Sequence, residues 1–414
     1  MTQASLRTVC LVLITAWLGS CIPQDDVALQ PEPRAPDITL RIGLVIDAAR
    51  VTIGGGGPFV VVDPDEGEIG RVDSATAVDA APRGTGVTVG GPIPDIQRRL
   101  LQIVSADTGG TLRVNGRNYR GTLELRRGTT GLTVVNVVGL EQYLGGVVGA
   151  EMGTRAAGEE EALKAQAVAS RTYAIRNRGR WQERGFDLIA DVNDQVYAGT
   201  RNENAMALDA VEATRGEVIT YNGEPIEAFY SSTCAGRTEE GSAAFAGARR
   251  PYLQSISDVD PSGTAWCAIS PRFRWTERWT ATQLANVLRR TLPANRLAST
   301  RAGDLSDLRV LDRTATDRVA TLELAGRNGR TLVLGQAIRR VLSMPGGGIL
   351  RSTDFSLRID RAGGRIERVE IEGRGNGHAV GMCQWGAVGR ARAGHDYATI
   401  LTSYFPGTEL RRMY

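Results

Sequence analysis

GLEQYLGGVVGAEMGTRAAGEEEALKAQAVASRTY, residues 139–173, is the stretch around which this chain is organised. Its first half carries apolar residues at helical spacing, namely Leu140, Tyr143, Leu144, Val147 and Val148. After a break at Gly153, three consecutive glutamates open a second segment, where a helix dipole favours acidic groups. That second segment has small residues on nearly every side. The stretch therefore predicts two helices, the second of them tightly buried among other elements.

Glu151 lies at the break, at the C-terminal end of the first predicted helix. The partial negative charge at a helix C-terminus disfavours an ionised carboxylate, so we expect the pKa of Glu151 to be raised. A carboxyl group with a raised pKa can donate a proton to a glycosidic oxygen. Taken alone, the same spacing also fits a surface glutamate in a loop.

Three separated segments carry further motifs. The first is VVGAEM followed by ALKAQAVASRTYA, the second is TRGEVITYNGEPIEAFYSSTCAGRTE (214–239), and the third is GNGHAVGMCQWGAVGRARAG (375–394) with the tail YATILTSYFPGTEL. Together they resemble the SpoIID/LytB family, the stage II sporulation protein D group. Three matches in the right order are far more specific than any one of them.

The resemblance implies an activity. The members of this family that are characterised as enzymes are lytic transglycosylases of peptidoglycan, and their catalytic acid is the glutamate of the Glu-Met pair. This implies that Glu151 is the acid/base and that glycan strands are cleaved between N-acetylmuramic acid and N-acetylglucosamine. One carboxylate suffices in such an enzyme because the 6-hydroxyl of muramic acid attacks, whereas a hydrolase usually needs two.

Residues around Glu151 in these motifs are our candidates for binding substrate. They include the only lysine of the chain, a loop rich in hydroxyls, a histidine among glycines, and an amide beside a tryptophan. The candidates are Lys164, Arg171, Tyr173, Ser232, Thr233, Glu239, His378 and Gln384. We expect Lys164 to occupy a buried site near Glu151 that favours a slim ammonium group, although an exposed position is also open. Glu227 and Glu239 are the candidates for a second carboxylate if the chemistry is hydrolysis.

Two rival functions remain at this point. LytB-type relatives are described as amidase enhancers, so the chain could bind the cell wall and stimulate an N-acetylmuramoyl-L-alanine amidase without cleaving glycan. Alternatively, Cys383 could be a nucleophile with His378 as its base, although no third group that would orient the histidine is evident. No phosphate loop, Gly-x-Ser-x-Gly elbow or HExxH motif is present.

Three cysteines beyond the leader, Cys234, Cys267 and Cys383, are an odd number for an exported protein. One disulfide with one free thiol is one interpretation. A second is that the cysteines are buried free thiols. A third is a zinc site in which His378 is the fourth ligand of a Cys₃His set. Each cysteine lies in or beside a motif, which predicts that the three converge in space. The expected glycan cleavage itself requires no cofactor.

The N-terminus predicts export. Residues 1–21 have a positive start, an apolar core and the ending Leu-Gly-Ser-Cys, which resembles a bacterial lipobox. We expect Cys21 to carry a lipid anchor and 22–37 to be a flexible tether, so that the protein is a membrane-anchored lipoprotein of the periplasm or cell envelope. The formal net charge of +3 is too small to indicate a nucleic-acid partner.

Composition and turn signals predict an α+β fold. A hydrophobic content of 42% in 414 residues is enough to fill a core. Hairpin turns are predicted at Asn115-Gly116 and Asn222-Gly223. We expect a mostly β N-terminal domain (38–138), a family core in two parts (139–267 and 372–414), and a small α/β insertion between them (268–371).

Overall fold

The computed structural model describes residue 1 and residues 38–73, 76–94, 96–245, 247–297, 305–327 and 329–414. Apart from Met1, the expected leader and tether lie outside these residues, and so does Cys21. The lipid anchor therefore stays a prediction. Within the described ranges, no helix is both long enough and apolar enough to cross a membrane.

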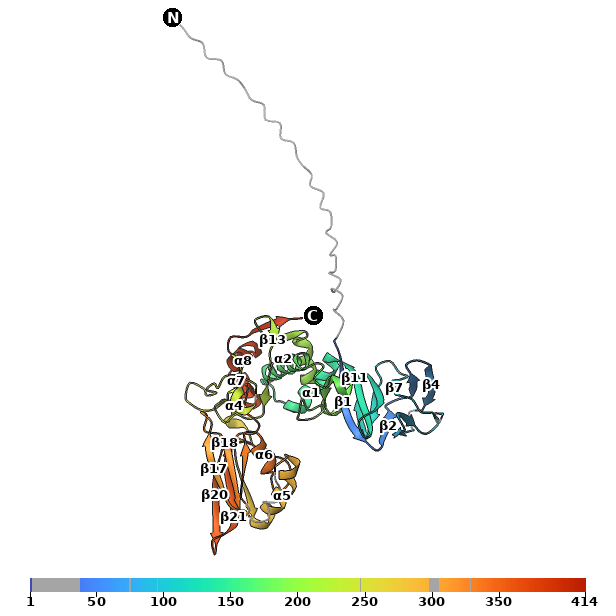
Figure 1. Cartoon of the computed structure of the whole chain (residues 1–414). Coiled ribbons are helices and arrows are strands. Elements are labelled where there is room, and N and C mark those ends of the chain that lie inside the picture. Colours follow the sequence, from blue (N-terminus) through green and yellow to red (C-terminus); the bar gives the residue numbers. More distant parts are fainter. Residues whose placement is uncertain (2–37, 74–75, 95, 246, 298–304, 328) are drawn as a thin grey trace. The chain divides into compact units, whose positions relative to one another are not determined.

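The N-terminal region is built from strands (Figure 1, blue to green). A seven-stranded sheet has the order β12 (Leu188–Ile189), β1 (Thr39–Ala48), β11 (Leu132–Gly139), β10 (Thr122–Arg127), β7 (Leu100–Ser105), β3 (Phe59–Asp63) and β4 (Gly67–Val72). A five-stranded sheet has the order β6 (Gly86–Val89), β5 (Val78–Arg83), β2 (Val51–Gly55), β8 (Leu112–Val114) and β9 (Arg117–Tyr119). The predicted turn between β8 and β9 is confirmed: Asn115 and Gly116 both have positive φ, at 46° and 80°.

The next elements surround one buried helix, α2 (Glu160–Arg176). From Ala162 to Ala174 every residue except Lys164 is buried, as the small residues predicted. α2 packs against β13 (Glu217–Tyr221) and against four helices: α1 (Leu140–Met152), α3 (Ala205–Ala213), α7 (Gln384–Arg392) and α8 (Tyr397–Tyr404). β13 lies between β14 (Glu224–Pro225), across the Asn222-Gly223 turn, and β23 (Glu409–Arg412). The remaining short helices here are α4 (Gly241–Ala244), η1 (Gln182–Arg184), η2 (Gly199–Asn202) and η3 (Trp266–Ile269).

A short parallel pair joins the second and third motifs. β15 (Tyr230–Ser231) pairs with β22 (Met382–Cys383), and Thr233 forms a bridge with Asn376. Segments about 150 positions apart in the sequence are thus hydrogen-bonded to each other.

The segment between the motifs has its own hydrophobic core, formed by residues from Trp275 to Ile371. One three-stranded sheet has the order β16 (Arg274–Thr280), β21 (Arg365–Arg374), β20 (Phe355–Ala362), and another the order β17 (Leu305–Arg313), β18 (Val319–Gly326), β19 (Gly329–Leu334). The helices are α5 (Ala281–Ala294) and α6 (Ala337–Val341). The fold is therefore α+β with a strand-rich N-terminal region, as the sequence predicted.

The glycines of α1 explain how a helix with poor intrinsic propensity is held in place. A Cβ at Gly149 would lie 1.9 Å from the carbonyl oxygen of Asn202, which belongs to η2. A Cβ at Gly145 would come close to the end of the Leu208 side chain, at 2.7 Å, and would otherwise make an ordinary contact with the Glu203 side chain at 3.9 Å. Close backbone approach at Gly149 therefore fixes the part of α1 that carries Glu151.

We expect Gly149→Ala to lower the free energy of unfolding by about 1–3 kcal/mol, because backbone must move to admit the methyl group. Gly145→Ala is the matched control, since a leucine side chain can turn away and alanine has the better helix propensity. Denaturant unfolding of the two variants checks this. Equal stability would contradict the close approach.

Candidate active site

Glu151 opens onto a cleft of about 720 Å³. The cleft is lined by the end of α1, by α2 and the residues just after it, by the loop 192–196, by the second and third motifs, by Phe245, Gly247 and Ala248, and by part of the insertion. Among the sequence candidates, it brings together Glu151, Tyr173, Ser232, His378 and Gln384. Residues from all three motifs therefore face one space.

The Glu151 carboxylate is held by one donor at each oxygen. Oε1 accepts a hydrogen bond from the backbone N–H of Val196 (3.1 Å), and Oε2 accepts one from Nε2 of Gln384 (3.2 Å). The Gln384 amide also donates to Oε1 of Gln166 on α2 (3.3 Å), which fixes its orientation. Burial raises the pKa of Glu151, and the two hydrogen bonds oppose that shift. The predicted direction is therefore confirmed, but its main cause is burial.

Tyr230 and the loop 192–196 were missed by the sequence analysis. Burial raises the pKa of Tyr230 well above its ordinary value, and the charge of Glu151 adds to that effect. The phenol is therefore neutral, and its oxygen accepts a hydrogen bond from Gln195 (3.0 Å). Asp194 anchors the same loop by accepting from the Tyr173 hydroxyl (3.1 Å) and from Trp181 (2.8 Å). Only the tertiary structure brings this loop to Glu151.

His378 is a neutral member of the cleft. Its Nδ1 accepts a hydrogen bond from the backbone N–H of Val380 (3.0 Å), so the ring proton lies on Nε2. Burial lowers the pKa of His378 to about 3, and the positive charge of Arg339 acts in the same direction. The ring lies 5.1 Å from that of Phe245 in an edge-on contact. His378 is thus suited to packing and hydrogen bonding rather than to carrying a charge.

This chain is similar to a described protein family and to several named proteins. The sequence profile described as SpoIID, Stage II sporulation protein, matches residues 128–221, which include Glu151. A stage II sporulation protein D of Bacillus subtilis (strain 168) is 33% identical over 292 residues, covering 67% of this chain and 75% of that protein. This chain belongs to the stage II sporulation protein D family.

Two further relatives and a second profile extend the comparison. An uncharacterised protein of Brachyspira hyodysenteriae is 30% identical over 302 residues, covering 72% of this chain and 73% of that protein. An amidase enhancer of Bacillus subtilis is 28% identical over 280 residues, which cover 60% of this chain and 38% of that longer protein. Residues 267–381, which include the insertion, match a profile described as a domain of unknown function (DUF8618).

Some candidates in the motifs of the family lie outside the cleft. Lys164 is partly exposed and pairs with Glu161 one turn earlier (2.6 Å), so the expectation of a buried ammonium near Glu151 is wrong. Arg171 is fully buried and forms a two-pronged ion pair with Glu141. Both cations therefore have structural partners and do not face the cleft.

Thr233 and Glu239 are likewise engaged elsewhere. The Thr233 hydroxyl hydrogen-bonds that of Ser270 (2.8 Å), and Glu239 Oε2 accepts hydrogen bonds from two threonine hydroxyls of the insertion, Thr314 and Thr316 (2.6 Å each). Ser232, which does line the cleft, lies 3.2 Å from Thr233, oxygen to oxygen. A second carboxylate at position 239 is therefore not available to a substrate in the cleft.

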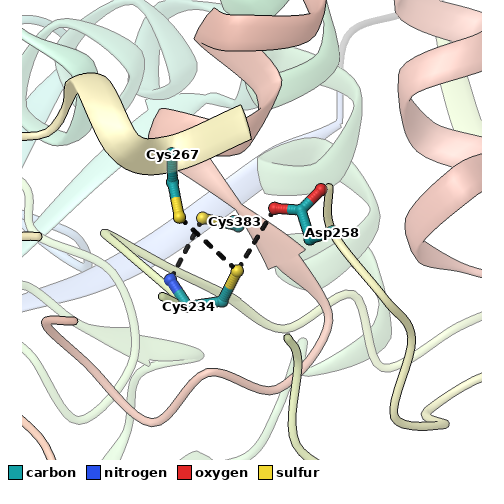
Figure 2. A group of neighbouring side chains, drawn as sticks. All are labelled: Cys234, Asp258, Cys267 and Cys383. Atoms are coloured by element: carbon teal, nitrogen blue, oxygen red, sulfur yellow. Dashed lines mark hydrogen bonds between the residues drawn. The ribbon is translucent and has the colours of Figure 1, made fainter. Parts of the chain in front are cut away.

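The three cysteines converge, as predicted, but their fourth neighbour is an aspartate. Cys234, Asp258, Cys267 and Cys383, the cysteine–aspartate cluster, are all buried, and their ligand atoms lie within 4.8 Å of one another (Figure 2). The cysteines are free thiols. His378 is not part of the cluster, so the Cys₃His set expected from the sequence is wrong in its fourth member.

The geometry also bears on the rival cysteine chemistry. Burial raises the pKa of Cys383 well above its ordinary value, and its sulfur accepts the N–H groups of Cys234 and Gly386. Among the described hydrogen bonds, none joins Cys383 to His378, whose Nδ1 is occupied by Val380. The pair therefore lacks the contact that a nucleophile and its base require.

The insertion supplies a cationic wall of the cleft, formed by Arg339 and Arg340 of α6. Arg339 donates to the carbonyl of Leu350 (2.9 Å) and Arg340 to the side chain of Asn295 (2.8 Å). Among the described residues, neither arginine is paired with a carboxylate. Burial and the neighbouring Arg340 lower the pKa of Arg339 to about 10, so it stays charged at neutral pH. The wall thus carries uncompensated positive charge.

We expect Glu151→Gln to stabilise the protein at neutral pH. Because the pKa of Glu151 is raised in the folded state, ionisation above that pKa costs stability, whereas below the unfolded value of about 4.3 both states bind the proton and no cost remains. The gain should therefore disappear below about pH 4. Thermal unfolding across pH checks this, with the exposed Glu183→Gln as control. The prediction would be contradicted if the stability gain of the variant over the parent were smaller at pH 7 than at pH 4.

Proposed function

We propose that this protein is a lytic transglycosylase that cleaves peptidoglycan between N-acetylmuramic acid and N-acetylglucosamine, with Glu151 as its single acid/base. Membership of the stage II sporulation protein D family and similarity to an amidase enhancer support a role at the cell wall. The observation that carries the proposal is a desolvated carboxyl group with a raised pKa in the wall of a large cleft.

In the proposed mechanism, protonated Glu151 donates its proton to the glycosidic oxygen as the bond from that oxygen to C1 of muramic acid breaks. The 6-hydroxyl of the same sugar attacks C1 and forms the 1,6-anhydro ring. The Glu151 carboxylate accepts the hydroxyl proton, which restores the acid for the next cycle. The Val196 N–H and the Gln384 amide stabilise the intervening carboxylate, because each donates to one of its oxygens.

The other carboxylates of the cleft favour one acid over two. Besides Glu151, the acidic residues that line it are Asp194 and Glu227. Asp194 is fully engaged by Tyr173, Arg180, Trp181 and a backbone N–H, and Glu227 pairs with Arg250 at 3.0 Å. A hydrolase would need a second carboxylate free to activate water. Attack by the 6-hydroxyl of the substrate avoids that requirement.

We expect Glu151→Gln to lower glycan cleavage at least about a hundredfold, because the amide neither donates nor accepts the catalytic proton. Glu239→Gln is the matched control. Glu239, in the second motif, is also a buried glutamate, but it lies outside the cleft. Mass spectrometry of digested glycan strands measures both the rate and the anhydro ends. Near-normal turnover by a folded Glu151→Gln protein would overturn the proposal.

The amidase enhancer relative supports a second candidate, a module that binds the wall and stimulates an amidase without cleaving glycan. The same digestion separates the two. A pure enhancer releases no anhydro-muramyl ends, with or without Glu151, but it increases the release of stem peptides when a purified amidase is added.

We expect the cationic wall to bind carboxylates of the stem peptides. Arg340→Ala should raise KM about two- to fivefold on strands that carry peptides, and less on denuded strands, because one exposed ionic contact is lost. The difference should shrink as salt is added. Arg358→Ala, an exposed arginine of the insertion outside the cleft, is the control. An equal effect of Arg340→Ala on both substrates would contradict peptide recognition.

A further inference from the structure

Four chain segments meet at the cysteine–aspartate cluster. Cys234 follows β15, Asp258 lies in the segment before η3, Cys267 belongs to η3, and Cys383 ends β22 (Figure 2). The sulfurs of Cys234 and Cys267 are 3.8 Å apart, which is no disulfide. With zinc–sulfur bonds of about 2.3 Å, two sulfurs of a tetrahedral site are about 3.8 Å apart. The observed separation of the two sulfurs matches the edge length of a zinc–thiolate tetrahedron.

Backbone N–H groups point at the sulfurs. Cys383 Sγ accepts from the N–H of Cys234 (3.2 Å) and from that of Gly386 (3.3 Å). The N–H groups of Ala235 and Gly236 hydrogen-bond to Cys267. Ala235 adopts a left-handed φ of 63°, which a residue with a Cβ rarely takes. The loop thus holds a strained conformation that aims donors at sulfur, an arrangement that favours the thiolates a metal ion requires.

The carboxylate of Asp258 is oriented by groups behind it. Its Oδ1 accepts from Nη2 of Arg390 (3.1 Å) and from the Tyr404 hydroxyl (2.9 Å), while Oδ2 lies 3.2 Å from Cys234 Sγ. Such outer hydrogen bonds are typical of carboxylates that bind metals. Three thiolates and one carboxylate carry four negative charges. A divalent ion together with Arg390 compensates three of these charges. A bound ion would therefore lower the energetic cost of burying them.

We propose that the cysteine–aspartate cluster binds one zinc ion. Thiolate-rich tetrahedral sets select zinc over magnesium or calcium, which prefer oxygen ligands. Four protein ligands close the coordination sphere, so the ion is structural and activates no water.

The ion would fix the surroundings of Glu151. Cys383 is the residue before Gln384, whose amide donates to the Glu151 carboxylate. Cys234 follows Ser232 and Thr233 in the loop that borders the cleft. A bound zinc ion would therefore hold the second and third motifs together behind the cleft. The site does not depend on the proposed glycan cleavage, since its ligands are separate from the acid.

Metal analysis of the full chain, purified without chelator, tests the proposal. We expect about one zinc per chain in the parent and in Glu151→Gln alike. Replacement of the ion by cobalt should give the charge-transfer absorption of thiolate ligands. A parent protein that holds no zinc, either with free thiols or lighter by the two hydrogens of a disulfide, would overturn the site.

Variants separate ligation from folding. Cys267→Ala should lose the zinc, whereas Asp258→Cys should keep it, because a fourth thiolate restores a common zinc set. Asp260→Asn, two residues from the ligand and outside the cluster, should hold as much zinc as the parent. Undiminished zinc in Cys267→Ala would contradict the assignment. If that variant does not fold, the zinc content and the cobalt spectrum of the parent still decide.

Discussion

The buried ion pair between Arg171 and Glu141 is the interaction on which the arrangement of this protein rests. The Arg171 side chain is fully buried, and its Nε and Nη2 lie 2.8 and 2.6 Å from the two carboxylate oxygens. Removing one partner of such a pair costs about 3–5 kcal/mol, because a buried charge is left alone. The pair fixes the start of α1 to the middle of α2. The ion pair holds one end of α1, and the close contact at Gly149 holds the other. The position of Glu151 is therefore fixed.

The other parts of the cleft are assembled on the same helix. Gln166 of α2 orients the Gln384 amide, and that amide meets Glu151. The pairing of β15 with β22 then brings the second motif beside the third. This assembly buries the Glu151 carboxyl group away from water. Burial, and not the helix dipole, is the main cause of its raised pKa. The cleft environment thus raises the pKa of Glu151 through burial, and only tertiary packing can achieve that.

The sequence predicted the features that depend on local chemistry. The two helices follow from the spacing of apolar residues, and the glycine turns follow from φ preferences. The convergence of the motifs was predicted from the family resemblance. It failed where a polar group has two plausible environments. Lys164 and Arg171 occur on the same helix as functional motifs, but their partners, Glu161 and Glu141, decide that they are structural. Asp258 gave no signal, because its role arises from a loop that no pattern relates to the cysteines.

The cationic wall has a consequence for how this family could diversify. Arg339 and Arg340 stand on a segment with its own hydrophobic core, whereas Glu151, Gln166 and Gln384 belong to elements of the main core. The glutamate that we propose as the acid and the arginines that we propose to bind substrate thus lie on parts of the chain with different hydrophobic cores. If the cleft binds wall polymers as we propose, substitutions between Trp275 and Ile371 would alter this wall of the cleft without replacing Glu151, Gln166 or Gln384.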